Sequence, residues 1–241
     1  MEALLKAGKE YICLMHIHSP IPQSKIHKAA KEFIGKITQM PPVKSAVKRQ
    51  LREREVYYLE ILEIKNQDVL FKVGCQAGTY IRTLCVNLGK TLGTNAHMQE
   101  LVRTKAGPFN ENEWYSLQDI KDAFTLYAEG NEKQLKKILK PVEFAVQHLG
   151  KIWVTDSAVD TICHGANLSI PGISKLNDHI EKENMIAVFT LKNELVSLGI
   201  SLMSSEEIIK AEKGLVIRTT KVFMDPETYP HFKRIIESYK S

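Results

Sequence analysis

The chain has 241 residues, 44% of them hydrophobic and 25% charged, with a formal net charge of +5 and a pI near 8.9. This length allows one large or two modest domains with real cores, and the apolar runs fall far short of the roughly 20 residues that a membrane span needs. Four scattered cysteines without CxxC spacing argue against a disulfide framework or a zinc site. The first residues lack the apolar stretch of a secretory signal. We therefore expect a cytoplasmic protein with no membrane partner.

The first predicted strand runs over 11–17, where apolar side chains alternate. A helix follows, with Ser24 as its expected N-cap. The apolar positions of this helix are Ile26, Ala29, Ala30, Phe33 and Ile34.

A basic segment comes next, after Pro41-Pro42. Its cations are Lys44, Lys48, Arg49, Arg52 and Arg54. Because apolar periodicity is weak here, we expect a protruding, mobile loop over 41–54. Composition leaves two alternatives for this loop: a solvated surface, or a loop that contacts phosphates with strong salt dependence.

A hairpin is predicted from the strands 56–64 and 69–75, joined by a turn at Asn66-Gln67. A helix then begins after Gly78-Thr79, which places Arg82 in or near its first turn. The apolar stripe of this helix is Ile81, Leu84, Cys85, Leu88 and Leu92. A cation in the first turn meets the positive end of the helix dipole, so Arg82 needs an anion nearby.

The next strand is predicted over 97–109, closed by Gly107-Pro108. Ser116 and Asp119 form a capping-box-like helix start. Helical patterns continue to about His148, with Pro141 in the first turn of the last helix.

The pattern of predicted elements changes near residue 149. A short strand over 151–154 and a helix capped by Asp156 or Ser157 precede several short strands separated by Gly, Pro or Asn. That spacing favours a small, strongly bent sheet or barrel-like module. The chain thus divides into an α+β part, 1–148, a mainly-β part, 149–225, and a tail, 226–241. The first part opens on a strand, which predicts a bare sheet edge that further polypeptide would cover.

Five segments resemble, in the same order, the RNA-guided pseudouridine synthases of H/ACA ribonucleoproteins. These are archaeal relatives of dyskerin and are similar to TruB, the bacterial tRNA synthase. The segments are AGKEYICLMHIH (7–18), QMPPVKSAVKR (39–49), AGTYIRTL (77–84), LGTNAHMQELVRTKAGPF (92–109) and DSAVDTICHGANLSIPGISKL (156–176). The resemblance implies part of a catalytic domain, with a mixed or antiparallel sheet and helices, followed by a small PUA domain that binds RNA.

The resemblance also implies a function. Uridine in rRNA, and also in tRNA, would be isomerised to pseudouridine without a metal or another cofactor. The PUA domain would bind an H/ACA guide RNA, which selects the substrate RNA by base pairing. The absence of a long lysine-rich tail favours an archaeal-type protein over a nucleolar one.

The family's catalytic aspartate lies in a Gly-Thr-Leu-Asp-Pro type loop shortly before the segment that matches 7–11. None of the aspartates in this sequence has that context. We therefore expect that the family's N-terminal segment is missing and that the chain alone is inactive. A late start codon, a cut chain and a split gene remain open as explanations.

The resemblance assigns site residues. Arg82 matches the arginine that pairs with the catalytic aspartate; the alternative is an arginine that only caps or snorkels. Tyr11 matches a tyrosine expected to stack under the flipped uracil and assist proton movement, and a core tyrosine is the alternative. Lys9 faces the same cleft or is a surface lysine. Ile81 and Leu84 form apolar pocket wall or core.

Further along the chain, Leu101 is expected near the active cleft. Arg103 and Lys105 either touch the RNA backbone or form structural ion pairs. The loop 41–54 corresponds to the family's thumb loop. It contacts substrate RNA or a small accessory protein, with Lys44, Lys48 and Arg49 as candidates.

In the PUA-like part, two segments are expected to face the ACA end of the guide RNA, with ligand-free tight turns as the alternative. Their residues are His164, Gly165, Ala166, Asn167, Pro171 and Gly172. Three histidines, His16, His18 and His97, are interpreted as strand or loop residues, because no pairing in the sequence supports a metal site.

Three functions are therefore compared. The first is a synthase subunit, active once the aspartate segment is present. The second is an inactive fragment that holds guide RNA and accessory proteins. The third, an unrelated basic α+β protein, requires several of the motif matches to be chance.

Overall fold

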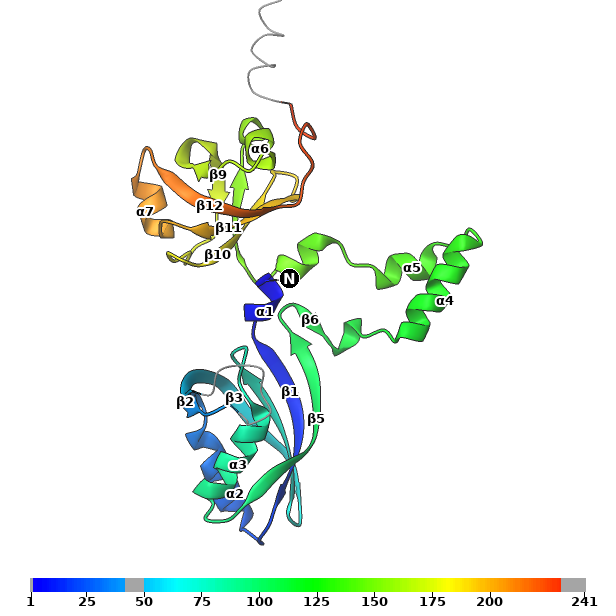
Figure 1. Ribbon diagram of the computed structural model, residues 1–241, viewed down its shortest axis with the longest axis vertical. Helices are drawn as coiled ribbons and strands as arrows, with labels where there is room; N and C mark the ends of the chain where they lie inside the picture. The colour runs from blue at the N-terminus through cyan, green and yellow to red at the C-terminus, as the bar shows by residue number, and fades with distance from the viewer. Residues whose placement is uncertain (1, 42–49, 231–241) are drawn as a thin grey trace, which may run out of the picture. The chain divides into compact units, whose positions relative to one another are not determined.

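The computed structural model describes residues 2–41 and 50–230, and it separates the chain into two compact units (Figure 1). The first unit ends at Leu139 and the second begins at Lys140. Within the described ranges, no helix is long and apolar enough to cross a membrane.

The first unit is built on a six-stranded sheet in which every pair of neighbouring strands is antiparallel. In sheet order its strands are β2 (Gly35–Gln39), β3 (Arg52–Lys65), β4 (Asp68–Cys75), β1 (Lys9–Ile17), β5 (Ala96–Ala106) and β6 (Phe109–Asn110). The predicted hairpin is confirmed as β3–β4, and the predicted first and fourth strands as β1 and β5. The short strand β2 was not predicted.

Two helices, α2 (Gln23–Glu32) and α3 (Ile81–Thr91), pack on one face of this sheet (Figure 1). The alternation predicted for β1 is confirmed, because Cys13, Met15 and Ile17 are buried against these helices. Their shared core buries apolar side chains, the main favourable contribution to folding. The open face of the sheet carries the alternate residues of each strand.

The remaining helices of this unit are α1 (Glu2–Lys6), a 3₁₀ turn over Glu111–Glu113, α4 (Leu117–Ala128) and α5 (Lys133–Ile138). The predicted capping box is confirmed: Ser116 caps α4 and exchanges hydrogen bonds with Asp119.

The second unit holds another six-stranded sheet, as the short apolar segments predicted. In sheet order its strands are β8 (Leu168–Ser169), β12 (Leu215–Val222), β11 (Leu195–Ser201), β10 (Met185–Phe189), β7 (Gly150–Val154) and β9 (Ile173–Leu176). Only β10 and β7 pair in parallel among these described strands. The helical segments are Val142–Val146 and Ile170–Gly172, both 3₁₀, α6 (Asp156–Cys163) and α7 (Ser205–Lys210).

Three predicted helix starts are wrong. Pro22 precedes α2, so Ser24 lies inside the helix. Thr155, not Asp156 or Ser157, occupies the N-cap of α6, and Pro141 lies at the N-cap of a 3₁₀ helix, one position before its first turn. Helix α7 was not predicted, although its capping box from Ser204 to Glu207 is visible in the sequence.

The basic segment also differs from the predicted loop. Arg52 and Arg54 belong to strand β3 and pair with Gln39 and Ile37 of β2. Regular backbone pairing therefore replaces a loop at this end of the segment. Lys44, Lys48 and Arg49 lie outside the described residues.

The predicted bare sheet edge is confirmed. On its outer side, β5 pairs within the described chain only with β6, through Lys105 and Ala106. The residues 99–103 in the middle of β5 are all exposed, on both faces of the strand. A long strand edge of this kind has unpaired backbone groups available to another strand.

Candidate active site and RNA-binding segments

The start of α3, which carries Arg82, is held by a buried side chain of β2. The Gln39 amide donates to the Tyr80 carbonyl at 3.1 Å and accepts from the Tyr80 backbone N–H at 3.0 Å. Tyr80 is the N-cap of α3 and its side chain makes no capping bond. Gln39, only 1% exposed, thus supplies the cap from another element. The sequence analysis missed this residue.

The turn before α3 requires glycine. Gly78 has a φ of +83°, a left-handed conformation that side chains rarely adopt. A Cβ there would also lie 3.2 Å from the guanidinium of Arg54. The base of the basic segment therefore packs against the turn that begins α3.

Arg82 is the second residue of α3, as the apolar stripe predicted, and its side chain is exposed. No hydrogen bond or ion pair joins it to any residue of 2–41 or 50–230. The first turn of α3 holds no acidic residue. A cation thus lies at the positive end of a helix dipole, beside no anion of the described chain.

Tyr11 lies near the start of β1, half-buried at the margin of the core. Its cross-strand neighbours are Val73 on β4 and Arg103 on β5. Burial, with the nearby Cys75 thiol, raises the pKa of the Tyr11 hydroxyl, and the Arg103 guanidinium opposes this rise. The phenol therefore stays protonated at neutral pH and can donate a proton or a hydrogen bond.

A β-bulge separates the two cations of β5. Glu10 pairs with Lys105, while its neighbour Tyr11 pairs with Arg103, so Thr104 is the additional residue. Thr104 donates to the Glu10 carboxylate at 2.6 Å. Bulges redirect side chains and are common beside active sites. Here the bulge leaves Arg103 beside Tyr11 and Lys105 opposite Glu10, where the charge of Lys105 helps to lower the pKa of the Glu10 carboxyl.

The four residues predicted for the substrate pocket lie in different environments. Ile81 and Leu84 are buried in the core, 3% and 0% exposed, which is the second of their two alternatives. Lys9 donates to the carbonyls of Leu4 and Ala7 at 2.8 and 2.6 Å, so it ties β1 to α1. Leu101 is 37% exposed and pairs with Cys13, next to the Tyr11–Arg103 pair.

In the second unit, the predicted segment after α6 is a helix end. The N–H groups of Gly165 and Ala166 bond to the carbonyls of Ile162 and Thr161, and Gly165 has a φ of +88°. This is the pattern of a left-handed helix C-terminus. His164, the C-cap, places Nδ1 2.8 Å from the Asp160 carbonyl, to which it donates, and is otherwise exposed.

The neighbouring residues attach to β12. Thr219 donates its hydroxyl to the Ala166 carbonyl at 2.8 Å and its backbone N–H to Asn167 Oδ1 at 3.0 Å. Pro171 is exposed, and Gly172 lies against Ala158 and Leu168. The first predicted segment is therefore a helix end fixed to β12, and the second lies in a 3₁₀ turn whose Gly172 carbonyl accepts from the Thr155 N–H.

Two exposed cations were missed by the sequence analysis. Arg218 and Lys221 flank the Thr219-Thr220 pair on β12, beside the segment that holds Asn167. In the sequence, the one sign of these residues is a cation at each end of the Thr-Thr pair. This sign is weak, because the contact between β12 and Asn167 is not visible in the sequence.

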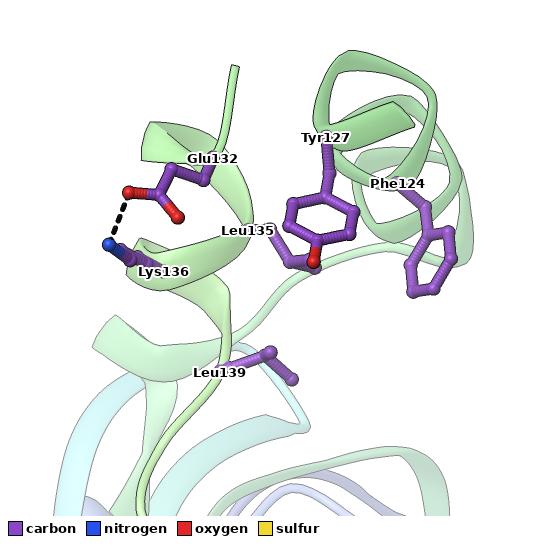
Figure 2. Close-up of a pocket in the computed structure, with 6 residues that line it drawn as sticks. All are labelled: Phe124, Tyr127, Glu132, Leu135, Lys136 and Leu139. Carbon is purple, nitrogen blue, oxygen red and sulfur yellow. Dashed lines mark hydrogen bonds and ion pairs between the residues drawn. The ribbon is translucent and has the colours of Figure 1, made fainter. Parts of the chain in front are cut away.

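A hollow of about 430 Å³ lies between α4 and α5 (Figure 2). Phe124, Tyr127, Leu135 and Leu139 supply its apolar lining, and a Glu132–Lys136 ion pair lies at its rim. None of the predicted site residues contributes to it. Its lining lacks the exposed arginine and the strand tyrosine of the candidate site, so we do not assign it to catalysis.

Three family models match consecutive parts of the chain. Residues 7–81 match the N-terminal domain of TruB family pseudouridylate synthases, and residues 82–147 match the C-terminal domain of tRNA pseudouridylate synthase B. Residues 150–223 match the PUA domain. Over 229 residues the chain is 52% identical to a "Probable tRNA pseudouridine synthase B" from Methanosarcina barkeri, covering 95% of this chain and 68% of the relative. The chain belongs to the TruB family of pseudouridine synthases.

A second TruB-family relative, of the same name and from Pyrococcus abyssi, is 52% identical over 232 residues, 95% of this chain and 70% of its own length. Among solved structures, the chain matches the "Crystal Structure of a Cbf5-Nop10-Gar1 Complex" with a TM-score of 0.93 and 48% identity, over 96% of this chain and 71% of that one. It also matches the "Structure of H/ACA RNP bound to a substrate RNA containing 2'-deoxyuridine" with a TM-score of 0.87 and 46% identity, covering 95% and 70%. The expected α+β catalytic domain with a PUA domain is confirmed.

Proposed function

We propose that this TruB-family chain is the substrate-holding and guide-binding part of an RNA-guided H/ACA pseudouridine synthase, which converts uridine to pseudouridine in rRNA and also in tRNA. The support for guided activity is the similarity to a solved H/ACA RNP bound to a substrate RNA. The curated relatives carry the name tRNA pseudouridine synthase B, and this similarity supports tRNA as a further substrate.

The reaction is an isomerisation. The glycosidic C–N bond of uridine breaks, the uracil turns, and a C–C bond to the same sugar replaces it. The base must leave its helix to be reached, at a cost of a few kcal/mol. We assign Tyr11 to stack against the uracil and to hold a proton at its hydroxyl. We assign Arg82 to orient a catalytic carboxylate that attacks or deprotonates the sugar, and to keep it ionised.

The observation that carries this proposal is the environment of Arg82. An exposed guanidinium sits at the positive end of α3, with no carboxylate of the described chain in contact. A guanidinium binds a carboxylate through two parallel hydrogen bonds when one is brought to it. We infer that the catalytic aspartate comes from polypeptide outside these 241 residues, so that the chain alone is inactive.

Binding partners follow from the same proposal. The turns at 164–167 and 171–172, with Arg218 and Lys221, are candidates for the ACA end of the guide RNA. The similarity to a complex with Nop10 and Gar1 supports small protein partners, and we place one of them at the segment 41–54. Leu101 and Arg103 would face the substrate RNA next to Tyr11.

An alternative function is that of an inactive scaffold that holds guide RNA and accessory proteins. The same exposed Arg82 favours it, because a scaffold needs no carboxylate there. The two functions predict the same RNA contacts and different chemistry.

The test is a guide–substrate conversion assay. The purified chain is mixed with an H/ACA guide RNA and its substrate, with and without a polypeptide that carries a Gly-Thr-Leu-Asp-Pro type loop. A parallel reaction contains a tRNA transcript and no guide. We expect the chain alone to bind guide RNA, and uridine to be converted only after the polypeptide is added. The chain together with this polypeptide is the completed enzyme.

Each outcome decides one part of the proposal. Conversion by the chain alone would show that the nucleophile is misplaced. Guide binding without conversion in the completed enzyme would favour the scaffold. Conversion of tRNA alone would contradict the guided activity.

A further inference from the structure

Three histidines that are far apart in the sequence lie together at the end of the first sheet remote from Tyr11. The ring centroids are 6.0 Å apart for His16 and His18, 5.5 Å for His16 and His97, and 5.1 Å for His18 and His97. The interpretation of these residues as strand or loop histidines is confirmed, but their grouping was not predicted. We call His16, His18 and His97, together with Asp68, the histidine cluster.

The backbone of three strands fixes the cluster. His16, on β1, is the cross-strand partner of Asp68 on β4 and of His97 on β5. Just beyond β1, the backbone N–H of His18 donates to the Asn95 carbonyl at 2.9 Å. Because side chains alternate along a strand, His16 projects from the face opposite to the buried Met15 and Ile17. The cluster therefore lies on the open face of the sheet.

The hydrogen bonds decide which ring nitrogens carry lone pairs. His16 Nδ1 lies 2.6 Å from Asp68 Oδ1, and an ionised carboxylate only accepts, so Nδ1 carries the proton. In the neutral ring, the lone pair of His16 is then on Nε2. His18 Nε2 and His97 Nδ1 lie 2.8 Å apart, so one donates to the other and the two nitrogens share one proton.

We propose that the histidine cluster binds a divalent transition-metal ion of the Zn²⁺ class. Neutral imidazole is a preferred ligand of such ions, and a histidine ligand commonly donates its second ring N–H to a carboxylate, as His16 does to Asp68. In a tetrahedral site with Zn–N bonds of about 2 Å, the ring centroids of histidine ligands lie about 5 Å apart. The spacing in the cluster is close to this value.

Binding requires a local rearrangement. As the side chains lie, no group of three or more His, Cys, Asp or Glu residues in the described ranges is arranged around a metal position. The ion would take the place of the proton between His18 Nε2 and His97 Nδ1, and His16 Nε2 would turn toward it. His18 and His97 are exposed, and exposed rings change rotamer rapidly. A water molecule would complete the four ligands.

Such an ion would stabilise the part of the first sheet that lies beside the unpaired strand edge. It would join β1 to β5, whose outer edge is largely unpaired. Because the ligands must be deprotonated, binding would weaken in mild acid. The cluster lies on the opposite face from Tyr11, so the ion would take no part in the isomerisation.

The test uses the untagged 241-residue chain, with Zn²⁺ in calorimetry and Co²⁺ in visible absorption. We expect one equivalent of Zn²⁺ to bind in the micromolar range or tighter, Co²⁺ to give the intense bands of a tetrahedral site, and Zn²⁺ to raise the unfolding temperature. If neither ion binds up to millimolar concentration, the proposal is wrong.

Variants separate the cluster from other histidines. His97→Gln and, independently, His18→Gln should weaken Zn²⁺ binding at least about 100-fold, and Asp68→Asn about 10- to 100-fold. The matched control is His27→Gln, on the exposed side of α2, which should bind Zn²⁺ as the unchanged chain does. Circular dichroism without metal checks that each variant is folded. Equal affinity in His97→Gln, His18→Gln and the control would overturn the proposal.

Discussion

The two sheets of this molecule end in different ways. On one side the first ends on β6, a two-residue strand that covers only the last two residues of the eleven-residue β5. The second ends on β8, with two residues, and β9, with four. Short edge strands are a common protection against pairing with other chains. In the second sheet, β8 and the bonds from Thr219 to Ala166 and Asn167 cover the outer edge of β12, whereas most of the outer edge of β5 has no partner in the described chain.

The side chains follow the same contrast. On β5, Leu101 and Val102 are 37% and 48% exposed, although both are apolar. On β8, at an edge of the second sheet, Leu168 is 2% exposed. Exposed apolar side chains beside an unpaired edge favour the addition of another strand. We therefore expect the first unit to gain structure and activity from added polypeptide, and the second unit to be unaffected by it.

The largest effect is expected at Arg82. In the completed enzyme, Arg82→Ala should lower the rate of pseudouridine formation at least about 1000-fold, because the carboxylate loses the cation that orients and ionises it. Guide RNA affinity should stay within about twofold, since Arg82 belongs to the first unit and the guide contacts to the second. Single-turnover kinetics and filter binding measure the two quantities.

Two controls sharpen this test. Lys90→Ala removes a cation from the last turn of the same helix and should leave the rate nearly unchanged. Arg82→Lys keeps the charge and loses the two-point hydrogen bond, so its rate should fall between the other two. If Arg82→Ala forms pseudouridine as fast as the unchanged enzyme, Arg82 does not have the proposed role.

The next effect concerns the first unit alone. Gln39→Leu should reduce the free energy of unfolding of this unit by about 2 kcal/mol, because the backbone N–H of Tyr80 loses its buried partner. Hydrogen exchange at the α3 amides should become faster, and exchange in β10 and β11 should not change. Gln118→Leu, on the exposed surface of α4, is the matched control and should have little effect. Equal stability of the two variants would show that Gln39 does not hold α3.

Gln39 also shows where sequence reasoning reached its limit. The start of α3 and the position of Arg82 were predicted correctly, because a helical apolar stripe is a local signal. The cap from Gln39 was not, because it depends on β2, and β2 is recognisable only through its pairing with Arg52–Val56. Composition indicated a loop at Arg52 and Arg54, but both residues belong to β3, because they pair with the distant segment β2.

The same distinction explains the rest of the site. Tyr11 and Arg82 were assigned from motifs, whereas the position of Arg103 beside Tyr11 depends on a bulge at Thr104. The grouping of His16 with His97 depends on the register of β1 and β5. Register is set by the whole buried face of a sheet, which no short motif contains.

The third effect belongs to the second unit. Gly165→Ala should reduce the free energy of unfolding of this unit by about 1 kcal/mol, because Gly165 has a left-handed backbone conformation. A Cβ there meets no atom of the chain within 4 Å, so conformation alone causes this loss. The same Cβ would project into the space proposed for the guide RNA, and guide affinity should fall severalfold at temperatures where the variant is folded.

Gly93→Ala is the matched control for this prediction. Gly93 lies in the first unit and also has a positive φ, +74°, and a Cβ added to it would likewise meet no atom within 4 Å. Its substitution should cost a similar free energy there and leave guide affinity unchanged. If both variants bind guide RNA equally well, Gly165 serves only to end α6.

The smallest effect is expected at Glu10, on the open face of the first sheet. Burial would raise the pKa of this carboxyl, but hydrogen bonds from Thr104 and Tyr58, with the charges of Lys72 and Lys105, lower it below its usual value. A carboxyl with a lowered pKa stabilises the folded state above its ordinary pKa, and this contribution is lost as the pH falls through the folded value. Lys72→Met should therefore reduce stability at neutral pH by a few tenths of a kcal/mol, since Lys72 lies 3.9 Å from Glu10 and is partly exposed.

The pH dependence distinguishes this electrostatic effect from a loss of packing. The difference between Lys72→Met and the unchanged chain should disappear in acid, where Glu10 is protonated in both, and the pKa of Glu10 measured by NMR should rise in the variant. Lys28→Met, on the exposed side of α2, should change neither quantity. A difference that persists at low pH would mean that the Lys72 side chain acts by covering β4, and that the charge network around Glu10 contributes little to the stability of the first sheet.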